Sequence, residues 1–234
     1  MKSKRFIMAD LLNIPLEFPF EQKQLVLLTC CAPCSCEVIE RLAKNNINTT
    51  ILFYNPNIFP EQEYNKRLRE NRKLAIKYGF PFIDLEYEAD KWLEEIKGLE
   101  NEPERGKRCE KCFSMRLRKT FEYAQRNGFK VVSSTLATSR WKDLSQVNEI
   151  GNRIAKDFSL DYWDINWKKS GGQIRKAELI KDLNIYEQDY CGCPFSHRTE
   201  KKVSEEKQIK DFNIEKTIED INPLTKKEID DLLK

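Results

Sequence analysis

Short apolar runs rich in β-branched residues alternate along this chain with stretches whose apolar residues recur every three to four positions. The runs have the length of strands and cover residues 25–29, 49–54, 82–87, 130–134 and 161–165. The stretches between them, such as 64–78 and 141–158, have the spacing of amphipathic helices. Regular alternation of this kind is typical of a mostly parallel sheet with helices on both faces. The pattern therefore predicts an α/β fold.

The loops that follow the predicted strands are where we expect the chemistry. In Rossmann-like and adenine-nucleotide-hydrolase-like sheets, ligands bind outside the carboxyl ends of the strands. The first predicted strand, 25–29, runs directly into the sequence CCAPCSC. This cysteine-rich segment is therefore predicted to lie at the functional site.

The chain divides into a long core region and a short charged tail. Its 234 residues can bury a sizeable core, and we expect residues 1–200 to form the α/β catalytic domain. Residues 201–234, rich in lysine and acidic residues, predict a short helical C-terminal appendage. No apolar run approaches the ~20 residues of a membrane span, and the N-terminal residues lack the apolar segment of a secretory signal. We therefore expect a cytoplasmic protein.

Composition narrows the chemistry further. With 41 basic and 38 acidic residues the net charge is only +3, so a nucleic-acid surface would need local clustering. Eight glycines argue against glycine-rich phosphate loops, and the single histidine, His197, excludes His-rich zinc or copper sites. Eight cysteines in a reducing compartment are metal ligands or redox groups more often than structural bridges.

All eight cysteines fall into three tight groups, which is the local signature of metal binding or redox exchange. The groups are Cys30, Cys31, Cys34 and Cys36; Cys109 and Cys112; and Cys191 and Cys193.

The pair Cys109 and Cys112 has helical spacing. We expect both sulfur atoms on one side of the first turn of a helix. There the helix dipole and the basic Arg105, Lys107 and Arg108 should lower the pKa of the thiols and favour thiolates.

The adjacent Cys30 and Cys31 can serve one centre only if the chain turns, because neighbouring strand residues point to opposite faces. Ala32 and Pro33 supply such a turn, and Pro33 is expected to start the next helix. Four thiolates from two separate loops suit a tetrahedral zinc site or an iron–sulfur cluster. The vicinal pair is atypical for zinc, and the position at a strand end favours a working cofactor.

The third group, Cys191-Gly192-Cys193, has two interpretations. Two cysteines separated by glycine can close a small, strained disulfide of the labile or catalytic kind. Alternatively, the two sulfur atoms ligate a second metal together with Cys34. We favour the redox pair.

Five motifs together resemble one known family. They are CCAPCS at 30–35, YNPNIFPEQEYNKR at 54–67, RCEKCFSMRL at 108–117, STLATSRWKD at 134–143 and QDYCGCPFS at 188–196. In this order they resemble the cobalamin-independent epoxyqueuosine reductase family, QueH, from about residue 25 to 196. One departure is Glu187, where the family pattern leads us to expect arginine.

The resemblance implies a two-electron removal of the epoxide oxygen of epoxyqueuosine at the wobble position of a tRNA anticodon, giving queuosine as the last step of its biosynthesis. It implies a 4Fe–4S cluster on four cysteines. These are Cys30, Cys31, Cys109 and Cys112. It also implies a redox-active disulfide between Cys191 and Cys193, and an adjacent mononuclear iron for which Cys34 or the CGC pair are the candidates. An electron donor of unspecified identity completes the set of partners.

A tRNA substrate should leave a footprint of positive charge and exposed rings. Three basic runs, 66–73, 101–119 and 168–176, are candidate phosphate contacts; the second has seven basic and three acidic residues, a local net charge of +4. Candidate rings for stacking on a base are Tyr54, Phe59 and Trp141. The candidate acids that would protonate the leaving oxygen are Asp143, Asp189, Tyr190 and His197.

Three other functions compete with this prediction. A zinc-stabilised RNA-binding module without catalysis would carry one colourless zinc ion. A thiol–disulfide oxidoreductase acting through CGC leaves six cysteines unexplained. An ATP-dependent tRNA sulfurtransferase would need a glycine- and serine-rich phosphate loop where this chain has TCCAPCS. The sequence therefore favours an epoxyqueuosine reductase.

Overall fold

The computed structural model describes residues 16–140 and 142–196 and centres on a five-stranded sheet in which every paired strand is parallel to its neighbour. The strand order is β3-β2-β1-β4-β5. Trp141, His197 and the appendage expected at 201–234 lie outside the described residues. The predicted α/β fold with a parallel sheet is confirmed.

The strands differ in length according to their place in the sheet. They are β1 (Gln24–Thr29), β2 (Asn48–Phe53), β3 (Phe82–Asp84), β4 (Val131–Ser134) and β5 (Asp161–Tyr162). The central β1 is buried on both faces after its first residue, which explains its continuous apolar sequence. The outermost strands, β3 and β5, are shorter than the predicted runs 82–87 and 161–165.

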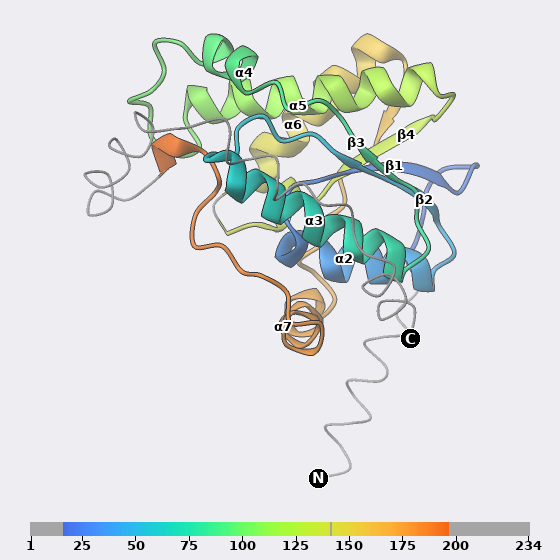
Figure 1. The fold of residues 1–234 in the computed structure, drawn as a ribbon. Helices are drawn as coiled ribbons and strands as arrows, with labels where there is room; N and C mark the ends of the chain where they lie inside the picture. Colours follow the sequence, from blue (N-terminus) through green and yellow to red (C-terminus); the bar gives the residue numbers. More distant parts are fainter. Residues whose placement is uncertain (1–15, 141, 197–234) are drawn as a thin grey trace.

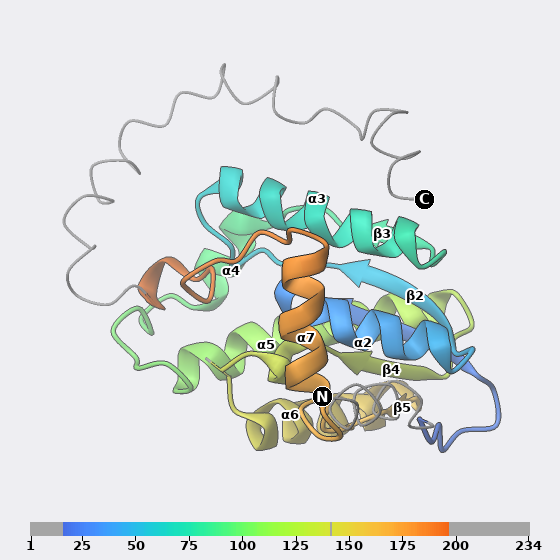
Figure 2. The same ribbon diagram turned by 90° about the horizontal axis from the view of Figure 1, so that it is seen from below.

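Helices cover both faces of the sheet (Figure 1). On one side lie α2 (Ala32–Lys44), α3 (Glu61–Lys77) and α7 (Gly172–Asp182), and Figure 2 shows α7 lying across α2. On the other lie α4 (Ala89–Glu95), α5 (Lys107–Arg126) and α6 (Leu144–Phe158). None of the helices within the described ranges combines the length and apolarity needed to cross a membrane.

Alternate residues of β1 pack into two separate hydrophobic cores. Val26 and Leu28 pack under α5 and α6, whereas Leu25 and Leu27 pack under α2. This is the two-residue side-chain period of a strand that is covered on both faces. Because both faces are filled, the open edge at the carboxyl ends of the strands is left for a site.

The strand order reverses between β1 and β4. From β1 the chain proceeds outward to β2 and β3, and it then returns to place β4 and β5 on the other side. A reversal of this kind opens a crevice at the carboxyl ends of the two central strands, where ligands of such sheets bind. Cys30 and Cys31 follow β1, and the short 3-10 turn Leu136–Thr138 follows β4. The predicted site therefore lies at the topological switch point.

Candidate metal centre

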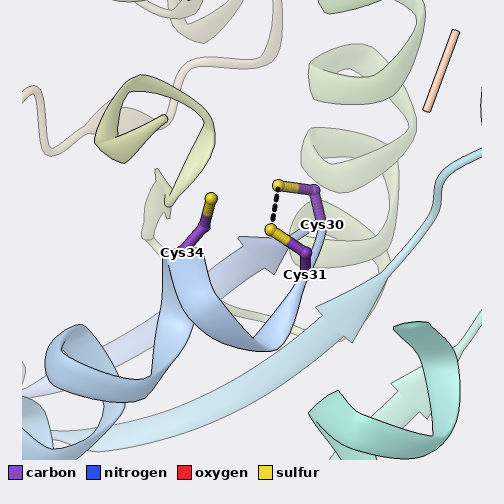
Figure 3. Close-up of side chains that lie close together, drawn as sticks. All are labelled: Cys30, Cys31 and Cys34. Carbon is purple, nitrogen blue, oxygen red and sulfur yellow. Dashed lines mark hydrogen bonds between the residues drawn. The ribbon is translucent and has the colours of Figure 1, made fainter. Parts of the chain in front are cut away.

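Three buried thiols after β1 form the tightest group of candidate metal ligands among the described residues. The sulfur atoms of Cys30, Cys31 and Cys34 all lie within 4.8 Å of one another, and those of Cys30 and Cys31 are 3.8 Å apart (Figure 3). None of these residues is more than 7% exposed. Soft thiolate sulfur at this spacing is a donor set for zinc or iron.

The local backbone explains how adjacent cysteines share one side. Cys31 is the extended N-cap residue of α2, and Pro33 lies in the first turn of that helix. The backbone N–H of Cys34 donates to the carbonyl of Cys31 at 3.1 Å and closes the turn. The turn that Ala32 and Pro33 predict is confirmed, and it brings the sulfur atoms together.

Cys36 is separate from this group although it is close in sequence. It packs on the other side of α2 among Leu25, Leu27 and Ile39, and it is fully buried. Burial raises the pKa of its thiol to about 12. Cys36 is therefore part of the core.

Cys109 lies in the first turn of α5, as predicted, whereas Cys112 lies in the second turn, and neither belongs to the tight group. Cys109 packs against the core cluster that contains Cys30, Cys31 and Cys34. The predicted lowering of their thiol pKa is wrong. Burial raises the pKa of Cys109 to about 11 and raises that of Cys112 as well, because the loss of hydration outweighs the nearby positive charges.

Two buried cations connect the cysteine groups. Arg116 and Lys142 both interact electrostatically with Cys30 and with Cys112. Cys191 in turn interacts electrostatically with Cys112 and with Cys109. The three groups that are separate in sequence thus converge on one region at the edge of the sheet.

Three N–H donors from different loops point at sulfur atoms. The Nε2 of Gln188 lies 3.0 Å from Cys31 Sγ, and the Nζ of Lys142 lies 3.7 Å from Cys30 Sγ. The backbone N–H of Arg105, a residue in the left-handed region at φ 68°, donates to Cys109 Sγ at 3.2 Å. Donors of this kind orient ligand sulfur atoms and tune a bound metal.

The sequence prediction missed two of these donors, Gln188 and Lys142. Both stand inside the motifs QDYCGCPFS and STLATSRWKD, but spacing marks only the cysteines. Sulfur hydrogen bonding with Cys31 and Cys34, together with the charge of Lys142, holds the pKa of Cys30 well below its ordinary value. The donors thus contribute to the electrostatics of the centre.

Hydrogen bonds to its backbone carbonyls hold the CGC loop in place. Arg67 Nη1 donates to the carbonyl of Cys191 at 3.0 Å, and the N–H of Phe59 donates to the carbonyl of Gly192 at 2.9 Å. Gly192 has φ 105°, and a Cβ there would lie 2.9 Å from both Arg67 Nη1 and Ile58 Cγ1. The position therefore requires glycine.

The two cysteines of this loop differ in accessibility. Cys191 is partly exposed, whereas Cys193 is buried beside Trp92 and Cys112. Both are free thiols in the structure, and burial raises the pKa of Cys193 above its usual range. A reagent or substrate would therefore reach Cys191 first.

The candidate acids have structural contacts. Asp143 is the N-cap of α6, and its carboxylate accepts the backbone N–H of Gln146 at 2.9 Å. The hydroxyl of Tyr190 donates to the carbonyl of Phe59. Asp189 is exposed beside it, as is Glu187.

Part of the predicted tRNA footprint lies in the interior. Tyr54 is 1% exposed and its hydroxyl donates to Glu88 at 2.6 Å, so the prediction that it stacks on a base is wrong. Phe59 is partly buried and packs on Trp92. Three arginines of the basic runs are also buried. These are Arg67, Arg108 and Arg116.

Comparison with known proteins gives one consistent result. The family model described as epoxyqueuosine reductase QueH matches residues 25–199. The chain is 49% identical to the epoxyqueuosine reductase QueH of Acinetobacter baylyi over 80% of this chain and 86% of that protein. It is 47% identical to the protein of the same name from Haemophilus influenzae, over 85% and 81%, and 34% identical to that of Thermotoga maritima, over 71% and 86%.

Proposed function

The chain belongs to the epoxyqueuosine reductase QueH family and is an oxidoreductase, and we propose that it removes the epoxide oxygen of epoxyqueuosine at the wobble position of a tRNA anticodon. The observation that carries the proposal is the convergence of three cysteine groups at the switch point of the sheet. Because the substrate is a tRNA, the proposed place of action is the cytoplasm. No observation favours the zinc-stabilised RNA-binding module.

The proposed cofactor is a 4Fe–4S cluster on the cysteines of two loops. The proposed ligands are Cys30, Cys31, Cys109 and Cys112. The donor chemistry fits, because these sulfur atoms are buried or partly buried, those of Cys30, Cys31 and Cys109 receive N–H donors, and two cations that offset negative charge lie nearby. When bound, the cluster would supply electrons one at a time. Cys34 would remain for an adjacent iron.

Oxidation of the CGC pair would supply the electrons and protons that the reduction needs. Oxidation of the Cys191 and Cys193 thiols to a disulfide releases two electrons and two protons. Conversion of an epoxide to an alkene and water consumes the same two electrons and two protons. The partial exposure of Cys191, the burial of Cys193 and the fixed backbone between them are compatible with a pair that cycles at one place. An external electron donor would then restore the dithiol.

Purification without oxygen is expected to yield about four iron and four acid-labile sulfide atoms per chain, the content of one cubane cluster. Dithionite should produce an EPR signal, and the reduced protein should convert epoxyqueuosine in tRNA to queuosine. An iron excess would indicate the adjacent mononuclear site. Stoichiometric zinc without sulfide, together with unchanged tRNA, would contradict the proposal.

Serine substitution at either end of the CGC pair separates a redox role from a ligand role. We expect Cys191→Ser and Cys193→Ser to keep the wild-type iron content and to lose multiple turnover, because serine cannot form the disulfide. Iron analysis and turnover of modified tRNA are the measurements. If both variants instead lose iron in equal amount, the pair ligates a metal; if both keep full turnover, the redox role is wrong.

A further inference from the structure

Lys142 is a buried cation whose charge faces sulfur. The residue is 6% exposed, and its Nζ lies 3.7 Å from Cys30 Sγ. Within residues 16–140 and 142–196, no carboxylate oxygen lies within 4.0 Å of this ammonium group. An ammonium group taken out of water needs a compensating partner, since its burial is otherwise costly.

The other buried cations near the site are compensated differently. Arg67 pairs with the carboxylate of Glu63 at 2.6 Å. Arg108 donates to backbone carbonyls, and Arg116 donates to Asn55 and to the carbonyl of Tyr54. Each therefore has an oxygen partner.

The charged and titratable groups that act on Lys142 are cysteines and one arginine. They are Cys30, Cys34, Cys112, Cys191 and Arg116. Since Arg116 repels the ammonium, the favourable interactions come from sulfur. Lys142 thus belongs with the thiols.

The backbone of Lys142 is held on both sides. The next residue, Asp143, caps α6 through the N–H of Gln146. Arg105, whose own N–H contacts Cys109, donates through Nη2 to the carbonyl of Arg140 at 3.0 Å. The lysine therefore projects from a fixed start of a helix rather than from a free loop.

We propose that Lys142 is a positioning residue whose permanent positive charge holds the Cys30 sulfur and offsets the negative charge of a thiolate-ligated centre, which makes that centre easier to reduce. The proposal rests on the proposed iron–sulfur function. Its physical basis is that net charge and hydrogen bonds to the sulfur atoms set the potential of such clusters. Of the three N–H donors to sulfur described above, only Lys142 donates from a charged group; the other two are a backbone N–H and a side-chain amide.

The test compares reduction potentials of the loaded protein. Lys142→Met removes the charge and keeps an unbranched side chain, whereas Lys142→Arg keeps the charge. Lys168→Met is the matched control, because the Nζ of Lys168 donates to the carbonyl of Ser139 at 3.3 Å and not to sulfur. In an EPR-monitored titration, the Met variant is expected to shift to a more negative potential, with Lys142→Arg and Lys168→Met close to wild type.

Equal potentials for Lys142→Met and wild type would overturn the proposal, and so would an equal shift in Lys142→Met and Lys142→Arg. If the Met variant holds no cluster, iron content becomes the measurement: retention by the Arg variant supports the role of charge, and loss from both folded variants overturns it. The metal-free proteins give an independent readout in urea unfolding. Cys30→Ala should cost less free energy of unfolding in the Lys142→Met background than in the wild-type background, because the charge that the Cys30 sulfur compensates is gone. Equal costs in the two backgrounds contradict the inference even if wild type holds no cluster, an outcome that by itself would refute the proposed function.

Discussion

Replacing Cys30 with alanine is expected to abolish epoxyqueuosine reduction and to lower the free energy of unfolding of the metal-free protein by about 3 kcal/mol. The activity is lost because the proposed cluster loses a ligand. The stability is lost because Lys142, 3.7 Å from the Cys30 sulfur, becomes a buried charge without its nearest partner. Turnover of modified tRNA and urea unfolding measure the two effects, and iron per chain reports the loss of the ligand.

The double variant Cys30→Ala with Lys142→Met separates the two causes. It should regain most of the lost stability, since the unpaired charge is gone, and should still lack activity. Cys36→Ala is the matched control, because this cysteine is buried in the other core; it should keep iron and activity and cost about 1 kcal/mol. A Cys30→Ala protein with full iron content, or one as stable as Cys36→Ala, would contradict this account.

Replacing Arg67 with methionine is expected to lower the free energy of unfolding by about 3–5 kcal/mol. The substitution leaves Glu63, 7% exposed, without its cation, although the hydroxyl of Tyr186 still donates to it. It also removes the donor to the Cys191 carbonyl. Since a misplaced reacting group costs on the order of 100-fold in rate, we expect turnover at saturating tRNA to fall by about that factor.

Two further variants serve as controls, one at Arg67 itself and one at Arg72 on the same helix. Arg72→Met breaks a partly exposed pair with Asp84 and should cost less than about 1 kcal/mol in urea unfolding. Arg67→Lys keeps the charge and loses the fork that contacts both the carboxylate and the carbonyl, so part of the stability should return while turnover stays low. Wild-type turnover in Arg67→Met would show that the CGC backbone needs no such anchor.

The central strands were predictable because burial on both faces leaves an unmistakable apolar run. The outer strands were not, because apolar residues there serve other contacts. Tyr87, predicted in a strand, packs on Tyr64 and donates its hydroxyl to the carbonyl of Ile58. Hydrophobicity alone does not distinguish such packing from strand pairing.

The sequence predicted that cysteines gather at the site, but it did not predict which neighbouring cysteines face the same side. Cys34 and Cys36 are two residues apart on α2, and an offset of two places side chains on opposite sides of a helix. The pKa of Cys109 was wrongly predicted because sequence shows the neighbouring charges and conceals the burial that opposes them.

The basic runs illustrate the same limit of local pattern. Arg67 and Arg108 belong to basic runs that the sequence predicts to face solvent or tRNA. Both are buried, and both donate to backbone carbonyls. Nothing in the order of residues separates an arginine that binds phosphate from one that supports a loop. The carbonyl partners come from distant segments, which only the fold brings near.

The placement of the cysteines at the starts of α2 and α5 also bears on the order in which the chain folds and acquires its metal. The two helices cover opposite faces of the sheet, and parallel pairing between distant segments must form before their first turns can meet. No short peptide of this chain contains the complete proposed ligand set, in contrast to a zinc finger, which folds around its ion. Maturation should therefore run from a folded, metal-free protein to a loaded one, with iron and sulfide delivered to a crevice that the polypeptide has already built.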